Sequence, residues 1–460
     1  MPPSLRRRTV LQGMMGSAAL GLSGRAFGAD DPQWTALAQD LRSETQWAWR
    51  HYVDRAFGHD QIKPLSGTHE PFYTRDQSVG LTIVEALDTL WLMELDEELE
   101  HGLDWIYSHL SFDIDAPFQV FEVSIRMLGG LLAGYHCVGD DRLLRLAADL
   151  GDRLLPAFTR SPTGIPYRFV SFATGAVGGV ETNLAEAGTY ITEFGTLSKL
   201  TGDDRYRAAA RRALEVTYSR RSALGLLPFA VHAETANWLN TTATVGPPAD
   251  SYYEYLFDGW KLLGDTELRD WYDSCMRAIL EHQSQRVDGR LWFAQVDVYT
   301  GEPVGSRQNE LASFFSGLLA EGGYLDQAKT YHRSWNDMQD HYGVLPEDID
   351  YRTLEVLSPG NQLRPEFVDG AFSLWLATRD DRYRRQAAKH YGLMKSTARA
   401  PYGYAILTDV LSGQQGDSCP SYWWCEQLKY YWLMFSNCPR FDYDDHYLST
   451  EGHMLRGARR

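Results

Sequence analysis

The sequence is poor in basic residues: its 460 residues include 44 Lys and Arg against 61 Asp and Glu, a net charge of −17. So negative a surface repels the phosphates of nucleic acids and the headgroups of anionic membranes. The sequence also lacks a strongly apolar run of about 20 residues, the length that a membrane-spanning helix needs. We therefore exclude nucleic acid as a partner and expect no membrane span.

Cysteine and histidine are scarce as well, and neither is grouped. Five cysteines without close paired spacing indicate neither a disulfide scaffold nor a thiolate metal site. Their odd number leaves at least one thiol unpaired, and Cys419 with Cys425 or Cys438 is the one disulfide that we consider. The 13 histidines have no zinc-ligand spacing. The sequence also has no Gly-x-Ser-x-Gly, P-loop or dinucleotide-binding motif.

The first 29 residues have the composition of an export signal. They contain four arginines and no acidic residue, and a weakly apolar run rich in Gly, Ala and Ser extends from Val10 to Gly24. These features predict a signal peptide over 1–29. The segment Arg7-Arg8-Thr9-Val10-Leu11-Gln12 indicates the twin-arginine type, with an ordinary secretory signal as the alternative. We expect an exported protein, periplasmic or extracellular, in which 30–460 form one domain.

Helical periodicity dominates that domain, and a longer repeat lies above it. Short polar turns return at intervals of roughly 60 residues, each after an apolar segment and before a charged one. Each unit therefore predicts a helical hairpin, in which an aspartate of the turn caps the outer helix. The turns contain Asp140, Asp203, Asp265 and Asp380, with weaker relatives at Asp96 and Asp326.

The two ends of the domain supply a further helical pair, 31–58 with 422–435. The helix expected over 423–432 is aromatic on nearly all sides, so neighbours must cover it from several directions. A closed ring provides that cover, whereas an open array of repeats would need polar caps at both ends. We predict an all-α fold consisting of a single closed barrel of about seven helical hairpins.

Acidic residues inside the apolar helices indicate a site, because an unpaired buried carboxylate costs several kcal/mol. Glu122 precedes Arg126 by one helical turn, while Asp250 and Glu366 begin two other inner helices. Each has a structural alternative: a salt bridge for Glu122, a helix cap for Asp250 and a favourable helix dipole for Glu366. Their joint position at the same end of successive inner helices indicates acid/base chemistry in one cavity.

Aromatic residues make up 13% of the chain, and their flat apolar faces suit sugar rings. A series of ordered motifs between Tyr52 and His453 strengthens this indication. The motifs are Ala56-Phe57-Gly58-His59-Asp60, Ala86-Leu87-Asp88-Thr89-Leu90, Phe121 to Gly130, Asp250 to Leu256, Leu363-Arg364-Pro365-Glu366, Glu426 with Leu428-Lys429-Tyr430, and Ser449-Thr450-Glu451-Gly452-His453.

Together these motifs resemble the class I α-1,2-mannosidases of glycoside hydrolase family 47. The resemblance implies an (α/α)7 barrel, in agreement with the hairpin repeat, and a catalytic domain over 30–460. It further implies a Ca²⁺-dependent exo-hydrolase that removes terminal α-1,2-linked mannose from mannose-rich oligosaccharides with inversion. Inversion would place the two catalytic carboxyls roughly 6.5 to 9.5 Å apart. We expect a monomer.

Roles for individual residues also follow from the resemblance. Glu122 corresponds to the general acid, acting directly or through a water, and Glu366 to the general base. Asp250 is the third central acid, and which of Glu122 and Asp250 donates the proton stays open. Thr450 corresponds to the direct calcium ligand, and Glu366, Asp369, Glu426 and Glu451 to residues that bind calcium through waters. Sugar contacts fall to Arg126, Glu186, Arg364, Glu426 and Tyr422, although plain packing is the alternative for Tyr422.

Three positions depart from the family pattern. Pro248 stands where many eukaryotic members have an arginine, Glu310 stands near a histidine of some members, and Ser313 replaces a disulfide cysteine. These departures leave the preferred glycan branch open. Two other functions compete: a non-catalytic module that binds mannan or glycoproteins, and a sugar isomerase on a related α/α barrel. The isomerase would need central histidines, which the sequence lacks.

Overall fold

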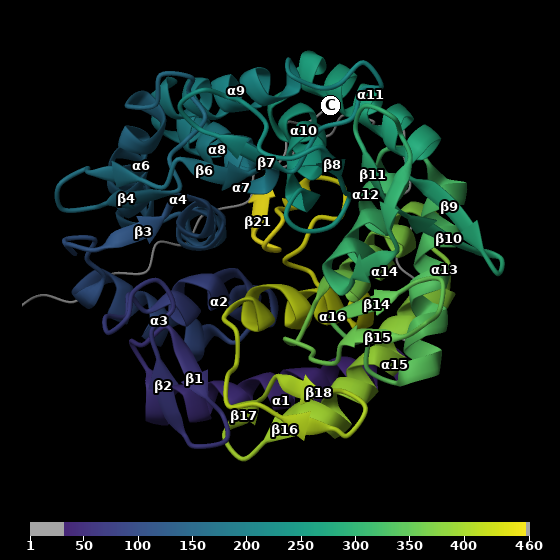
Figure 1. The fold of residues 1–460 in the computed structure, drawn as a ribbon. Coiled ribbons are helices and arrows are strands. Elements are labelled where there is room, and N and C mark those ends of the chain that lie inside the picture. Colours follow the sequence, from purple (N-terminus) through teal and green to yellow (C-terminus); the bar gives the residue numbers. More distant parts are fainter. Residues whose placement is uncertain (1–31, 457–460) are drawn as a thin grey trace, which may run out of the picture.

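The computed structural model describes residues 32–456, so the predicted signal peptide at 1–29 lies outside the described residues. Within them, helices form seven pairs arranged in a ring, six of them hairpins and one made of the first and last helices (Figure 1). This arrangement confirms the predicted (α/α)7 barrel. The pairs, inner helix first, are α2 (Leu81–Leu92) with α3 (Asp96–His109), α5 (Gly129–Val138) with α6 (Asp141–Thr159), α8 (Ile191–Thr201) with α9 (Arg205–Tyr218), α10 (Asp250–Leu263) with α11 (Thr266–His282), α12 (Phe315–Glu321) with α13 (Leu325–Tyr342), α14 (Glu366–Thr378) with α15 (Asp381–Ala398), and α16 (Leu428–Phe435) with α1 (Pro32–Ala56).

Short helical segments lead into several inner helices at one end of the barrel. Two of them are π-helical, a geometry that occurs often at functional sites. They are α4 (Val120–Glu122) and the π-helix η1 (Val123–Leu128) before α5, α7 (Leu184–Gly188) before α8, the 3₁₀ helix η2 (Glu310–Phe314) before α12, and the π-helix η3 (Trp423–Gln427) before α16.

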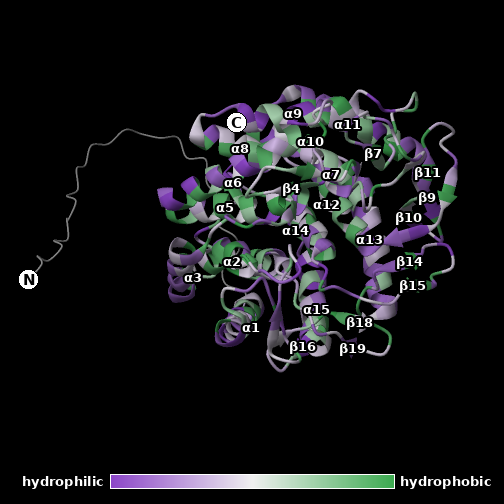
Figure 2. Cartoon of the chain, turned by 60° about the vertical axis from the view of Figure 1, so that its left-hand side comes forward, coloured by the Kyte–Doolittle hydropathy of each residue, from purple (hydrophilic) through white to green (hydrophobic). Residues whose placement is uncertain are grey.

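Burial explains why the inner helices are apolar and the outer ones amphipathic. In α2 every residue except Trp91 is buried, whereas α3 buries only Leu99, Gly102 and Ile106, which share one helix face. Figure 2 shows the contrast, with α2 largely in the hydrophobic colour and α3 in the hydrophilic one. Close packing matters as well, since a Cβ on Gly130 of α5 would lie 2.8 Å from the carbonyl oxygen of Val84 in α2.

Four of the six predicted turn aspartates bind backbone amides at the start of the next outer helix, as expected. The N–H groups of Arg142, Arg205, Glu267 and Arg382 donate to Asp140, Asp203, Asp265 and Asp380, respectively. The two weaker turns differ, because Asp96 and Asp326 lie inside the first helical turn and no side chain caps α3 or α13. There the acids can still favour the helix through its dipole.

The predicted closing pair is also confirmed, because α1 packs against α16. Trp34 of α1 stacks on Phe435 of α16 with ring centroids 6.1 Å apart, and the Trp432 indole donates to the Leu92 carbonyl of α2 at 2.9 Å. Neighbours on several sides thus cover the aromatic helix, which is what the prediction of a closed ring requires.

Short antiparallel strands in the loops were not predicted, because strands of two to four residues are too short to show an alternating pattern. They are β1 (Gln61–Lys63) with β2 (Thr68–Glu70); β3 (Pro117–Gln119), β4 (Phe169–Ser171) and β5 (Val177–Gly178); β6 (Glu181–Asn183) with β7 (Ala230–His232); β8 (Thr242–Ala243), β11 (Gln295–Asp297) and β12 (Pro303–Gly305); β9 (Ser284–Val287) with β10 (Arg290–Phe293); β13 (Arg307–Asn309), β14 (Asp348–Asp350) and β15 (Val356–Ser358); β16 (Arg399–Ala400) with β17 (Gly403–Tyr404); β18 (Leu407–Asp409) with β19 (Gln414–Gln415); and β20 (His446–Leu448) with β21 (Met454–Arg456).

The β20–β21 hairpin differs from the others because it enters the ring of inner helices (Figure 1). Leu448 pairs with Met454 next to its turn, so the intervening residues 449–453 form the tip. The tip contains Thr450 and Glu451, both predicted as part of the site. A segment far along the chain therefore reaches the centre of the barrel.

The disulfide that we considered for Cys419 is wrong, because all five cysteines are free thiols. The thiols of the suggested partners bind elsewhere: the Cys425 sulfur contacts a Glu85 carboxylate oxygen at 3.7 Å, and the Cys438 sulfur contacts the Leu92 carbonyl at 3.3 Å. In the described part of the chain, no helix combines the length and apolarity needed to cross a membrane.

Candidate active site

All of the site residues predicted from the sequence line one cavity of about 300 Å³ at the centre of the barrel. They come from the end of α4, from η1, from the first turns of α7, α10 and α14, from the residue two before α14, from η3 and the residue before it, and from the β20–β21 tip. The positive ends of helix dipoles favour carboxylates in such positions. The residues are Glu122, Arg126, Glu186, Asp250, Arg364, Glu366, Asp369, Tyr422, Glu426, Thr450 and Glu451.

Glu122 makes the predicted salt bridge with Arg126, since its Oε2 accepts from Arg126 Nε at 2.7 Å. The pair is not isolated, however. The Nη1 of Arg126 also donates to Glu451 at 2.6 Å and to Glu85 at 3.3 Å. One buried guanidinium therefore serves three carboxylates, and Glu122 keeps its other oxygen for the cavity that it lines.

Asp250 does not cap its helix, contrary to the structural alternative. Ala249 occupies the N-cap position of α10 and no side chain caps that end. The Asp250 carboxylate accepts only from the neighbouring Ser251 N–H, at 2.9 Å. Burial raises the pKa of Asp250 to about 6, against the opposing effects of that hydrogen bond and of Arg364. Its carboxyl can thus exchange a proton near neutral pH.

Arg364 and Tyr422 are held at the cavity by a shared set of hydrogen bonds. Arg364 forms a bidentate pair with Glu347, with N–O distances of 3.0 Å, and donates to the Tyr422 hydroxyl at 3.3 Å. That hydroxyl donates in turn to the Gln362 carbonyl at 2.6 Å. Tyr422 is half-buried and lines the cavity, so its ring is available to a ligand as well as to packing.

Glu186 is fixed by three neighbours around the cavity wall. Gln119 donates to its Oε1 at 2.9 Å and the Thr182 hydroxyl to its Oε2 at 3.1 Å. The half-exposed Arg168 completes the set with an ion pair at 3.0 Å. This anchoring leaves little freedom for the side chain, which suits a residue that orients a ligand.

The floor of the cavity collects carboxyl groups with raised pKa values. Burial raises the pKa of Glu366 to about 7 and that of Glu451 to about 8 despite the opposing arginines. Burial and repulsion from nearby carboxylates also raise the pKa values of Asp369 and Glu426. Acids crowded in this way hold protons near neutral pH, and a cation that binds among them would displace those protons.

Glu254 belongs to this floor but was missed by the sequence analysis. It lies one turn after Asp250 on α10 and lines the cavity, and burial raises its pKa to about 8. Its Oε2, like that of Glu366, is buried without a hydrogen-bond partner. The signal was present, since an acid one helical turn from a site aspartate shares its face.

These groups fit a hard cation. Oxygen donors are what calcium prefers, and a bound cation would balance the charge that these carboxyls acquire when they lose their protons. The unpaired oxygens of Glu254 and Glu366 lie at the same floor as Thr450. In the lining of this cavity, within the described residues, no histidine or cysteine offers a softer ligand.

A buried ion pair between Lys429 and Asp88 anchors the tip that carries Thr450. This pair was not predicted from the sequence. Lys429 Nζ donates to Asp88 Oδ2 at 2.6 Å and to the Gly452 carbonyl, and the Met454 N–H donates to the same Asp88 oxygen. Gly452 has a φ of 66°, and a Cβ there would lie 3.0 Å from the Cys425 carbonyl oxygen. Only glycine fits this close approach without strain.

The three positions that depart from the family pattern, Pro248, Glu310 and Ser313, lie in different surroundings. Pro248 lines the cavity after a cis peptide bond with Pro247. Glu310 is buried and accepts from the Asn361 amide at 2.8 Å, in the loop that leads to Arg364. Ser313 is buried in η2. Pro248 alone of the three therefore lines the cavity.

Comparison with known proteins agrees with this geometry. The model of "Glycosyl hydrolase family 47" matches residues 44–457. Alpha-mannosidase I MNS5 of Arabidopsis thaliana is 31% identical over 91% of this chain and 77% of its own length. Mannosyl-oligosaccharide 1,2-alpha-mannosidase MNS1 of the same plant is 31% identical over 93% and 80%, respectively.

Solved structures give the same fold. The alpha-1,2-mannosidase from Trichoderma reesei superposes with a TM-score of 0.84 at 23% identity, covering 92% of this chain and 99% of that one. Since the family model spans most of the chain, and the predicted barrel and cavity are both present, the chain belongs to glycosyl hydrolase family 47.

Proposed function

We propose that this chain is a calcium-dependent, inverting exo-α-1,2-mannosidase that removes terminal α-1,2-linked mannose from mannose-rich oligosaccharides. The observation that carries the proposal is the meeting of Glu122, Asp250 and Glu366 in one cavity of about 300 Å³. A pocket of this size suits a terminal sugar rather than the middle of a glycan. The names of its relatives as α-1,2-mannosidases support the linkage.

Hydrolysis needs one carboxyl to protonate the leaving oxygen and another to activate a water. We assign the first role to Glu122, acting directly or through a water, and the second to Glu366. Asp250 stays the alternative acid, because burial raises its pKa to about 6 whereas the Arg126 guanidinium lies 2.7 Å from Glu122. Arg126, Glu186, Arg364 and Glu426 would hold the sugar hydroxyls, with the Tyr422 ring against the sugar face.

We assign the calcium site to Thr450 as the direct ligand, with Glu366, Asp369, Glu426 and Glu451 binding through waters. When bound, the ion supplies a hard Lewis acid that can exchange waters for adjacent sugar hydroxyls. The chain's part is to hold Thr450 on the anchored tip and to keep the carboxylates around it. Glu254, which the Thr450 hydroxyl contacts, would steady that threonine.

The test is incubation of the full chain with α-1,2-mannobiose, with calcium and with a chelator, while proton NMR follows the anomer first released. We expect β-mannose with calcium and none with the chelator. Initial release of α-mannose would refute inversion, and release in the chelator would refute the calcium requirement. No release under either condition, together with tight binding of mannobiose, would favour the non-catalytic module.

A sugar isomerase is less well supported. Cellobiose 2-epimerase from Bacillus thermoamylovorans shares the fold at 10% identity with a TM-score of 0.56, which says nothing of activity. Within the described residues, no histidine lines the cavity to move a proton in the way that an isomerase needs. Incubation with free mannose and detection of fructose or glucose would reveal such an activity.

We further propose that the protein is exported through a twin-arginine signal at 1–29 and acts as a monomer in the periplasm or outside the cell. Replacement of Arg7 and Arg8 by lysine should keep the protein inside the cell if the signal is of this type. Light scattering of the purified chain would test the monomer.

A further inference from the structure

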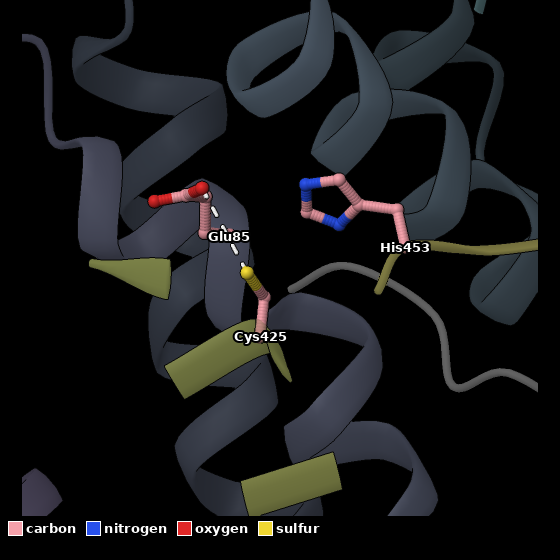
Figure 3. A group of neighbouring side chains, drawn as sticks. All are labelled: Glu85, Cys425 and His453. Atoms are coloured by element: carbon pink, nitrogen blue, oxygen red, sulfur yellow. Dashed lines mark hydrogen bonds between the residues drawn. The ribbon is translucent and has the colours of Figure 1, made fainter. Parts of the chain in front are cut away.

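Glu85, Cys425 and His453 form a buried cluster next to the cavity floor (Figure 3). One ligand atom from each lies within 4.8 Å of the others, and none of the three side chains is exposed. Glu85 comes from α2, Cys425 from η3, and His453 from the β20–β21 tip. The proposed hydrolysis uses none of them.

Several atoms of this cluster have no hydrogen-bond partner. Glu85 Oε2 and both ring nitrogens of His453 are buried and unpaired. The Ser421 hydroxyl and the Arg126 carbonyl lie near them and stabilise the charged forms of Glu85 and His453, respectively, but neither makes a bond of good geometry. Unpaired polar atoms in a dry interior are costly. An ion that accepts the lone pairs of these atoms would remove that cost.

The atoms on offer are a carboxylate oxygen, a thiol sulfur and an imidazole nitrogen. This mixed set suits zinc and its neighbours among the transition metals, whereas calcium takes oxygen ligands. The Cys425 sulfur lies 3.7 Å from Glu85 Oε1, close to the edge of a tetrahedron with Zn–S and Zn–O lengths of about 2.3 and 2.0 Å. In Figure 3 the His453 ring faces Glu85 across the space above the sulfur.

We propose that Glu85, Cys425 and His453 bind a divalent transition-metal ion of the zinc type, separate from the proposed calcium site. Binding would release the thiol proton to solvent, so the thiolate and the Glu85 carboxylate together balance the two charges of the ion. The His453 ring has two buried nitrogens without a hydrogen-bond partner, and one of them would bind the ion. A neutral ring is the form that binds metals.

The surroundings support such an ion. Arg126 donates to Glu85 Oε1 at 3.3 Å, an outer contact of the kind that orients metal-binding carboxylates. Around Arg126 stand the acidic groups of Glu85, Glu122 and Glu451, so three acids share one arginine and can help to balance the charge of a bound cation. The cluster adjoins the cavity, since Cys425 also lies within 4.8 Å of Glu426 and Glu451, which line it.

The sequence spacing could not reveal this site, because 340 residues separate Glu85 from Cys425. Its structural role follows from the elements that it joins. The ion would tie the β20–β21 tip to α2 and to η3, next to Thr450 and Glu451. It would thus fix the segment that supplies the proposed calcium ligand.

The experiment uses the full chain, stripped of metals with a chelator and returned to buffer with excess Ca²⁺, so that oxygen sites are filled. Titration with Co²⁺ should give one cobalt per chain and a thiolate-to-cobalt absorption in the near ultraviolet, which Zn²⁺ then abolishes. Absence of this band in the wild type overturns the proposal by itself, whatever the variants do.

Two variants locate the ion. Cys425→Ala should lose the cobalt band and weaken zinc binding at least about 10-fold. Cys275→Ala, a buried cysteine of α11, is the matched control and should keep both. A band that survives in Cys425→Ala would refute this site. If Cys425→Ala does not fold by circular dichroism, His453→Gln provides the same comparison with the same two outcomes.

Discussion

Lys429 Nζ and Asp88 Oδ2 lie 2.6 Å apart, and both side chains are completely buried. The same Asp88 oxygen accepts from the Met454 N–H, and Lys429 also donates to the Gly452 carbonyl. Two inner helices thereby hold both sides of the β20–β21 tip. The same ion pair therefore stabilises the barrel and holds the segment that positions Thr450.

Replacement of Lys429 by Met should therefore destabilise the protein by about 3–5 kcal/mol, because it leaves the Asp88 carboxylate buried and unpaired. Urea unfolding in calcium measures the loss. Lys389→Met, which breaks an exposed pair with Asp340, should cost at most about 1 kcal/mol. Equal losses in the two variants would contradict a special role for the buried pair.

The acid and base assignments predict different responses to the leaving group. Glu366→Gln should lower kcat about 10²–10⁴-fold on both α-1,2-mannobiose and α-mannosyl fluoride, because both need an activated water. Glu122→Gln should lose a similar factor on mannobiose only, since fluoride leaves without a proton. If Asp250→Asn, and not Glu122→Gln, keeps its activity on the fluoride, then Asp250 is the acid.

Calcium removal should make stability depend on pH in a defined direction. Burial raises the pKa values of Asp250, Glu366 and Glu451 to about 6, 7 and 8, above the values near 4 of unfolded carboxyls. Between about pH 4 and 8 the folded, calcium-free protein binds more protons than the unfolded chain, so its stability falls as pH rises.

Thermal unfolding at pH 5 and pH 8 measures this effect. In a chelator the Tm should be lower at pH 8. Added calcium should raise the Tm more at pH 8 than at pH 5, because the ion competes with protons for the carboxylates. A chelator-treated protein whose Tm increases from pH 5 to pH 8 would contradict the charge arrangement proposed for the cavity floor.

Tyr422 variants separate sugar contact from packing. Tyr422→Phe keeps the ring and loses only the hydrogen bonds to Gln362 and Arg364, so KM should change little. Tyr422→Ala removes the aromatic face, and KM for mannobiose should rise about 10-fold or more. If both variants keep the wild-type KM and differ only in Tm, the ring serves packing alone.

The sequence predicts the barrel well because its strongest signals are local. The turn aspartates and the apolar inner segments recur along the chain, and each turn with its flanking segments predicts one helical hairpin. The acids of the cavity were also within reach, because Glu122, Asp250 and Glu366 each interrupt or begin an apolar helix. Glu254 was not predicted as a site residue, although it lies one helical turn after the predicted Asp250 on the same helix.

Other features depend on contacts between distant segments and could not be predicted. Lys429 lies in a helix that the sequence predicts to be covered on several sides, but only the folded chain reveals that Asp88 lies opposite. The free thiols follow the same logic, because Cys425 faces Glu85 rather than another cysteine. The short strands could not be predicted either, because hydrogen bonds to partner strands define them and no alternating sequence pattern does.

The position of the β20–β21 tip has a consequence for how the protein is made. Thr450, Glu451 and His453 leave the ribosome after every helix of the ring has been synthesised. A nascent chain can therefore assemble its helical walls first, and its central acids meet the β20–β21 tip only after the segment that follows α16 has been synthesised. The proposed metal sites would therefore be completed only after the β20–β21 hairpin has been added to the ring.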